Sequence, residues 1–274
     1  MSETKEKVLD LLREYTGFHN IYLTQRGNKA IRAALAAAKN LNPKSHCLVP
    51  DQGGWITYQQ YPKKLQLWLN ELKTDYGIIN LEDLKSKTNL ASSLIYSNPA
   101  GYFAEQPIEE IYEICKDKCV VILDATGSLG DNKNLGKNAD IIVGSFGKWK
   151  PVNLTYGGFI AFKSENAYEL HKEIIEDLSF DEKYLEKLFD KLKNVKKRYK
   201  KFYDLNRKIK EDLKKHDIIH PEKKGINVIV KFSNEEERVQ LLNYCKENEL
   251  EYTFCPRYIR VNENAISIEV KRVI

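Results

Sequence analysis

Between residues 19 and 162, the chain alternates short apolar runs with longer stretches in which apolar residues recur every three or four positions. The apolar runs predict strands at 19–25, 46–50, 92–98, 119–125, 139–146 and 157–162. Helices are expected over 27–40, around 59–71 and over 107–118. Apolar strands separated by helices indicate an α/β fold, in which a mostly parallel sheet is covered by helices.

The pattern changes after residue 164. Residues 165–216 have helical spacing throughout, which predicts a long amphipathic helix or helices. Beyond this segment, strands at 226–232, 258–262 and 265–271 and a helix at 235–248 predict a small α+β unit. We therefore expect a large domain over 1–164, a linking helical segment over 165–216 and a small C-terminal domain over 217–274.

Composition agrees with a globular protein. Of the 274 residues, 42% are hydrophobic and 30% are charged, which is enough apolar material for a core and excludes wholesale disorder. No apolar run approaches the roughly 18–20 residues that span a bilayer, and the charged N-terminus lacks the apolar centre of a signal peptide. The five cysteines are scattered without a CxxC pair, so we expect neither a disulfide framework nor a metal site, and a cytoplasmic location.

The net charge of +5 comes from one segment. Residues 181–215 contain fourteen Lys or Arg and seven Asp or Glu, so they contribute +7 and the rest of the chain −2. The lysines and tyrosines of 195–203 could follow a phosphate backbone, which makes nucleic-acid binding an alternative function. A solvated face on a linking helix explains the same charges, and nucleic acid is the less favoured partner.

Chemistry-bearing residues gather at the predicted strand ends, where open parallel sheets bind their ligands. Gly27 and Asn28 follow the first strand, and the free amides of the next helix would bind an anion there, with Asn28 as its N-cap. Asp124 ends the most apolar strand, where a carboxylate needs a partner. Lys148 and Lys150 follow another strand; a lysine in a dry cleft has a lowered pKa and can form a Schiff base.

Each feature also has a purely structural interpretation, but their order along the chain resembles the fold type I pyridoxal-phosphate enzymes, the aspartate aminotransferase superfamily. The resemblance extends over about residues 15–162. It implies that Gly27 and Asn28 hold the cofactor phosphate, and that Trp55 stacks on the pyridine ring. Tyr58 is a weaker candidate for that stacking position. The resemblance also implies a homodimer and a small-molecule substrate.

The same resemblance assigns three further positions. Asn98, in the Asn-Pro turn, would contact the ring hydroxyl, and Asp124 would pair with the ring nitrogen. Ser145 would add a phosphate contact. The expected activity is that of a pyridoxal-phosphate-dependent aminotransferase acting on a small amino-acid or amino-sugar type substrate. A shortened non-catalytic or lyase-type relative of the same fold is the alternative.

The Schiff-base lysine is ambiguous. The class I and class V patterns within SFGKWK select Lys148, whereas the pattern of the DegT-like sugar aminotransferases selects Lys150 and agrees with the spacing to Gly157 and Gly158. We favour Lys148 because the small Gly147 precedes it, with Lys150 as the alternative. Arg260, in a strand-like stretch of the small domain, is the expected substrate-binding arginine. Gly127 stands where many family members have Tyr, Gln or His.

Overall fold

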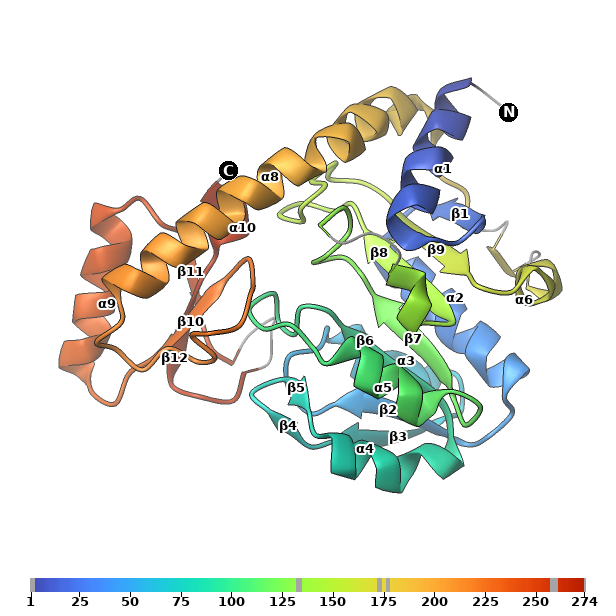
Figure 1. Ribbon diagram of the computed structural model, residues 1–274, viewed down its shortest axis with the longest axis horizontal. Helices are drawn as coiled ribbons and strands as arrows, with labels where there is room; N and C mark the ends of the chain where they lie inside the picture. Colours follow the sequence, from blue (N-terminus) through green and yellow to red (C-terminus); the bar gives the residue numbers. More distant parts are fainter. Residues whose placement is uncertain (1–2, 132–134, 172–173, 176–177, 257–260, 274) are drawn as a thin grey trace.

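The computed structural model describes residues 3–131, 135–171, 174–175, 178–256 and 261–273, and it is built around a seven-stranded sheet (Figure 1). Across the sheet, the strands are β1 (Asn20–Thr24), β9 (Gly158–Phe162), β8 (Ile141–Ser145), β7 (Val120–Asp124), β6 (Ala91–Ser97), β2 (His46–Pro50) and β3 (Trp68–Leu72). β9 runs antiparallel to both of its neighbours, and the other pairs are parallel. The carboxyl ends of β6, β7 and β8 therefore meet at one edge.

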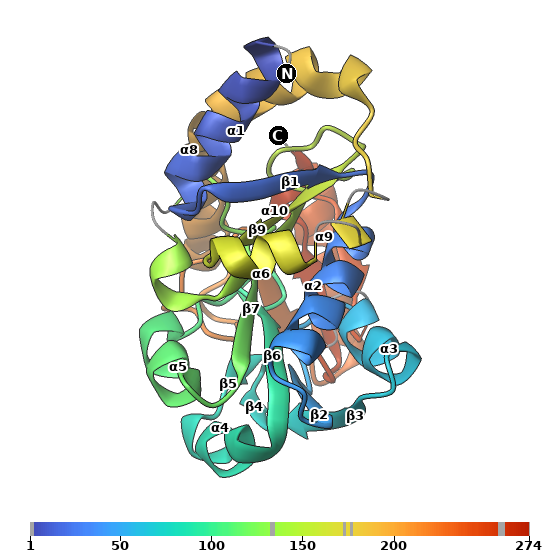
Figure 2. The same ribbon diagram turned by 90° about the vertical axis from the view of Figure 1, so that its right-hand side faces the viewer.

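Helices cover both faces of the sheet (Figure 2). On one face, α2 (Gly27–Leu41) buries a row of alanines against Ile95 and Ile122. On the other face, α5 (Ile108–Cys115) packs against Leu94 and Val121. Because successive strand residues point to opposite faces, the uninterrupted apolar runs of β6 and β7 supply both layers.

The other elements before residue 185 are helices, 3-10 turns and one small hairpin. They are α1 (Glu3–Thr16), α3 (Thr57–Lys64), α4 (Leu81–Lys87), α6 (Glu165–Leu170), the 3-10 turns η1 (Thr88–Leu90), η2 (Leu135–Asn138) and η3 (Glu182–Tyr184), and a hairpin of β4 (Thr74–Asp75) and β5 (Ile78–Ile79). The expected helix around 59–71 is wrong in its second half, because residues 68–72 form the edge strand β3. Trp68 is 72% exposed there, so the strand lacks an apolar run that would mark it.

A single helix, α8 (Leu185–Asp212), connects the large sheet to the C-terminal unit. Its apolar face is buried as the spacing predicts, and Tyr15 of α1 donates a hydrogen bond from its hydroxyl to the Leu192 carbonyl (3.1 Å). The expectation that 165–216 is helical throughout is wrong, because residues 178–181 lie outside helices. No helix in the part of the chain that the structure describes is long and apolar enough to cross a bilayer.

The C-terminal unit is a three-stranded antiparallel sheet with helices. Its strands are β10 (Val228–Lys231), β12 (Ala265–Ile268) and β11 (Tyr252–Phe254), in that order, and its helices are α9 (Glu235–Glu247) and α10 (Val270–Val273). The strand expected over 265–271 is too long, since α10 begins at Val270. Residues 258–260 of the strand expected over 258–262 lie outside the described residues. The predicted fold class is confirmed, whereas the division into 1–164, 165–216 and 217–274 stays a prediction.

Candidate active site

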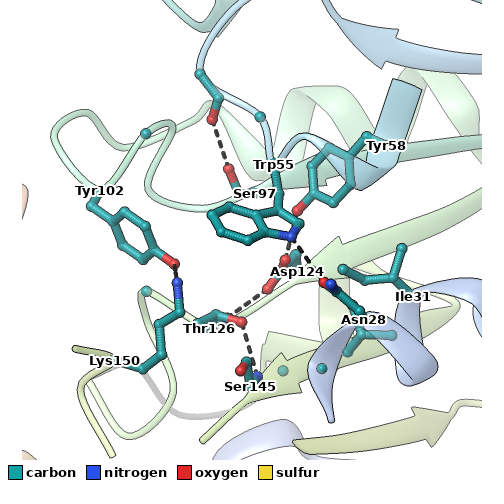
Figure 3. Close-up of a pocket in the computed structure, with 17 residues that line it drawn as sticks. Asn28, Ile31, Trp55, Tyr58, Ser97, Tyr102, Asp124, Thr126, Ser145 and Lys150 are labelled. Atoms are coloured by element: carbon teal, nitrogen blue, oxygen red, sulfur yellow. Dashed lines mark hydrogen bonds between the residues drawn. The ribbon is translucent and has the colours of Figure 1, made fainter. Parts of the chain in front are cut away.

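A cavity lies at the carboxyl ends of β6, β7 and β8, beside the beginning of α2 (Figure 3). Its lining includes eight of the residues that the sequence singled out, namely Gly27, Asn28, Trp55, Tyr58, Asp124, Gly127, Ser145 and Lys150. Parallel strands bring these positions together although more than 120 residues separate them, as expected for an open α/β sheet.

The anion-binding end of the cavity is formed by the α2 N-terminus and Ser145. A Cβ atom on Gly27 would lie 2.6 Å from the Ser145 Cβ, so only glycine lets the helix begin so close to β8. Thr126 fixes this end from the loop after β7, because its hydroxyl accepts a hydrogen bond from the Ser145 amide (3.0 Å). The expected N-cap role of Asn28 is wrong: α2 begins at Gly27, so Asn28 lies inside the helix.

Asp124 is held in a fixed orientation at the end of β7. It is only 6% exposed. Its Oδ2 accepts a hydrogen bond from the Tyr58 hydroxyl (2.6 Å), and its Oδ1 accepts one from the Thr126 amide (2.9 Å). Burial, and to a lesser extent the neighbouring Asp124 charge, raises the pKa of Tyr58 well above its usual value, so this phenol stays protonated and remains a hydrogen-bond donor. Tyr58, a weaker candidate for stacking, is thus a partner of the carboxylate.

Trp55 forms an aromatic side of the cavity. Its indole Nε1 donates a hydrogen bond to Asn28 Oδ1 (2.9 Å), which fixes the ring beside the α2 N-terminus (Figure 3). The Lys150 Nζ lies 4.7 Å from the centroid of the same ring. The indole is therefore held next to both the anion-binding end and the amine.

The two lysines of SFGKWK are placed differently. Lys150 lines the cavity, and its Nζ donates a hydrogen bond to the Tyr102 hydroxyl (2.8 Å). Desolvation lowers the pKa of Lys150, although the Asp124 and Glu269 charges oppose this effect. Lys148, our favoured residue, is exposed, and its Nζ lies over the Trp149 ring at 4.3 Å from the centroid. The structure brings Lys150, and not Lys148, to the lining of this cavity.

Asn98, another predicted position, lies outside that lining. Asn98 is buried, and its Oδ1 accepts a hydrogen bond from the Gln106 amide (2.9 Å). Arg260 falls outside the described residues. Gly127, where we noted a departure from the family pattern, does line the cavity. A Cβ atom there would lie 2.9 Å from Pro99 Cδ and 3.0 Å from the Tyr102 ring, so Tyr102 occupies the space of a side chain at 127.

Sequence reasoning missed Tyr102 and Thr126. Tyr102 has a φ of 70°, in the left-handed region where a bulky residue is an outlier, and such strain concentrates at functional sites. The sequence around Tyr102, SNPAGYF, predicts a turn, but it does not predict which way the Tyr102 ring points. Thr126 is two residues beyond Asp124, in a stretch where the sequence pattern pointed only to Asp124 and Gly127.

The side chains present fit pyridoxal phosphate. The close approach of Gly27 to Ser145 places the α2 N-terminus, which favours anions, in the cavity lining, Asp124 presents a fixed carboxylate, and Lys150 supplies an amine with a lowered pKa. Trp55 adds a flat apolar face. These are the chemical groups that a phosphorylated, protonated heterocyclic aldehyde requires.

Comparisons with known proteins agree with this geometry. Residues 3–202 match the DegT/DnrJ/EryC1/StrS aminotransferase family, and residues 196–274 match the MJ1341 family C-terminal domain. The comparison with curated proteins found no match. Among solved structures, serine palmitoyltransferase from Sphingomonas wittichii has a TM-score of 0.76 and 13% identity, over 98% of this chain and 71% of that protein.

A second structural neighbour is described as a sugar aminotransferase from Streptococcus pneumoniae, in its PLP form. It has a TM-score of 0.75 and 13% identity, over 98% of this chain and 86% of its own. At such low identity, both neighbours show the fold alone. The family match, in contrast, extends over more than half of the chain. The chain therefore belongs to the DegT/DnrJ/EryC1/StrS aminotransferase family and is a fold type I, pyridoxal-phosphate-dependent enzyme.

Proposed function

We propose that the protein is an aminotransferase for a small amino-acid or amino-sugar type substrate, and that Lys150 is the residue that links covalently to the cofactor. The observation that supports this most strongly is the position of Lys150. It is the one lysine among the described residues that line the cavity, and it lies in the same cavity as Asp124 and the Gly27–Ser145 end. The family match favours the same residue, since the DegT-like pattern selects Lys150.

The chain's own residues would hold the cofactor at three points. The α2 amides after Gly27, with Ser145 and Thr126, would bind the phosphate. Trp55 would cover one face of the ring, and Asp124 would keep the ring nitrogen protonated. When bound, the cofactor supplies an electron-withdrawing ring that stabilises negative charge on the substrate carbon.

Lys150 is suited to accept and return a proton at its Nζ. Burial favours its neutral form, and a neutral amine is both a nucleophile and a base. Tyr102 beside it has a pKa well above its usual value because of burial, so its phenol remains protonated and can donate to the neutral amine. The lysine amine is thus held in place whether it donates or accepts in this hydrogen bond.

Borohydride reduction of the cofactor-loaded protein, followed by peptide mapping, tests the assignment. We expect the cofactor adduct on Lys150, and we expect Lys150→Ala to abolish it. Lys148→Ala is the matched control, since it removes an equal side chain two residues away and should leave the adduct intact. An adduct on Lys148 would overturn the assignment and restore the class I and class V patterns as guides to the reaction.

The alternative functions have less support. A lyase-type or non-catalytic relative would share the cavity, and turnover with an amino donor separates these cases. Nucleic-acid binding rests only on the basic face of α8. A homodimer and a cytoplasmic location stay predictions.

A further inference from the structure

Two charged side chains are buried in the C-terminal unit, outside the lining of the active-site cavity. Glu269 and Lys271 are 4% and 5% exposed, and they form an ion pair with each other. The Lys271 Nζ also donates a hydrogen bond to Asn227 Oδ1 (3.0 Å). Because both charges lose their hydration, such a pair often stabilises a fold no better than apolar side chains of the same volume. Its presence therefore needs a reason other than stability.

The pair belongs to a polar network inside the unit. Glu269 Oε1 accepts hydrogen bonds from the hydroxyls of Ser267 and Thr253, both at 3.1 Å. Asn227 donates from its side chain to Ser267 Oγ (3.2 Å), and its carbonyl accepts from Asn206 of α8 (2.9 Å). Glu269 and Lys271 are thus fixed by residues of β11, β12 and α8 and by Asn227, just before β10, which makes the network rigid.

This network reaches the active site through Tyr102. The Lys271 Nζ lies 4.5 Å from the Tyr102 ring centroid, and the Lys150 Nζ lies 5.0 Å from the same centroid. The Tyr102 carbonyl accepts hydrogen bonds from the amides of Ile226 (2.7 Å) and Asn227 (3.0 Å), immediately before β10. The C-terminal unit therefore holds both the backbone and the ring of the residue that contacts the Lys150 amine.

The charged side chains that act on Lys150 come from β7 and from the C-terminal unit. Asp124 faces it from β7 and favours its protonated form. Glu269 acts in the same direction and Arg272 in the opposite one, both from the C-terminal unit. Desolvation lowers the pKa of Lys271 to about 8, and repulsion between the Lys271 and Lys150 charges contributes to this shift. The neighbouring phenol, Tyr102, stays protonated.

We propose that Glu269 and Lys271 are positioning residues for the reaction, which hold the Tyr102 ring against Lys150 and set the charge around that amine. The C-terminal unit is, on this proposal, a working part of the active site although the pair does not line the cavity. The inference rests on the proposed role of Lys150.

The test is a pH titration of the visible spectrum of the cofactor-loaded, full-length protein, since the absorbance reports protonation of the nitrogen that links Lys150 to the cofactor. Lys271→Met removes a positive charge within about 10 Å of this nitrogen, so the midpoint should rise, by about half to one pH unit. Glu269→Gln removes a negative charge and should lower the midpoint, by a smaller amount, because the loss of Glu269 also lowers the pKa of Lys271 and so weakens the positive charge there. General damage to the fold would not move the two midpoints in opposite directions.

Two controls complete the design. Lys271→Arg keeps the charge and should restore the wild-type midpoint. Lys210→Met removes another largely buried lysine, which donates a hydrogen bond to the Lys223 carbonyl, and it should leave the midpoint unchanged. If Lys271→Met does not fold, the midpoint of Glu269→Gln alone tests the proposal: a lowered midpoint supports the positioning role, and an unchanged midpoint overturns it.

The outcomes separate this inference from the proposed function. Midpoints that stay at the wild-type value in both variants, or move in the same direction, would overturn the positioning role while the adduct still maps to Lys150. An adduct that maps to another lysine would refute the proposed function, and this inference with it.

Discussion

Replacing Gly27 by alanine should impair cofactor binding through one steric contact. The added Cβ would lie 2.6 Å from the Ser145 Cβ and 3.2 Å from its Cα, whereas non-bonded carbon atoms prefer about 3.5–4.0 Å. The two elements must therefore separate by about 1 Å. Ser145 cannot yield alone, because β8 is paired with β7 and β9.

The size of the effect follows from this contact. Overpacking of a well-packed site costs about 1–3 kcal/mol, which for a chain of this length lowers the melting temperature by roughly 2–12 °C. The same displacement moves the α2 amides relative to Ser145. Loss of one charge-assisted hydrogen bond to the phosphate costs about 1.5–3 kcal/mol, so cofactor affinity should fall about 10- to 150-fold.

Equilibrium titration with pyridoxal phosphate, monitored by absorbance, measures the loss of cofactor affinity. A thermal melt measures the fall in melting temperature. Gly147→Ala is the control, because its Cβ would contact Ser145 only at the hydroxyl, at 3.2 Å, and would not push α2 away from β8. We expect a smaller loss of affinity in that variant. If Gly27→Ala binds the cofactor as tightly as Gly147→Ala does, the α2 N-terminus is not the phosphate site.

Two further predictions concern buried polar groups. Tyr58→Phe keeps the ring but removes the hydroxyl that donates to Asp124, so cofactor affinity should fall about tenfold while the fold persists; unchanged affinity in the same titration would contradict the role of this phenol. Burial lowers the pKa of Lys271 from 10.5 to about 8. Between these two pH values the unfolded chain therefore binds more protons at this residue than the folded chain does. The contribution of Lys271 to the free energy of unfolding should accordingly rise with pH, by up to about 3 kcal/mol. Urea denaturation from pH 8 to 10 should show that rise relative to the double variant Glu269→Gln/Lys271→Met, and parallel curves would count against it.

Local sequence signals were sufficient for the centre of the fold and for part of the site. The runs at 119–125 and 139–146 are apolar on both faces, and a strand buried on both faces leaves that mark on its own sequence. Asp124 and Ser145 could be placed because they end such strands. The edge strand β3 has only Leu72 buried, so its sequence was mistaken for the continuation of a helix.

The choice between Lys148 and Lys150 depends on the path of the loop. Trp149, Asn153 and Thr155 all have positive φ angles, at 62°, 49° and 71°. This irregular backbone turns Lys150 toward Tyr102 and leaves Lys148 exposed. The spacing to Gly157 and Gly158 pointed to Lys150, but the small residue before Lys148 pointed the other way, and local sequence could not decide between them. The contact between Lys271 and Tyr102 joins positions 169 residues apart, so it also depends on the complete fold.

The position of β1 at the edge of the sheet has a consequence for the order of events on the ribosome. Its strand partner, β9, is completed only at Phe162, 138 residues after β1 ends at Thr24. At about 5–20 residues per second, the nascent strand would wait roughly 7–28 s for it. The α2 N-terminus packs against Ser145, which also pairs with β9. A nascent chain that stops before Gly158 therefore lacks a finished phosphate site, and cofactor capture should begin only after the large sheet has closed.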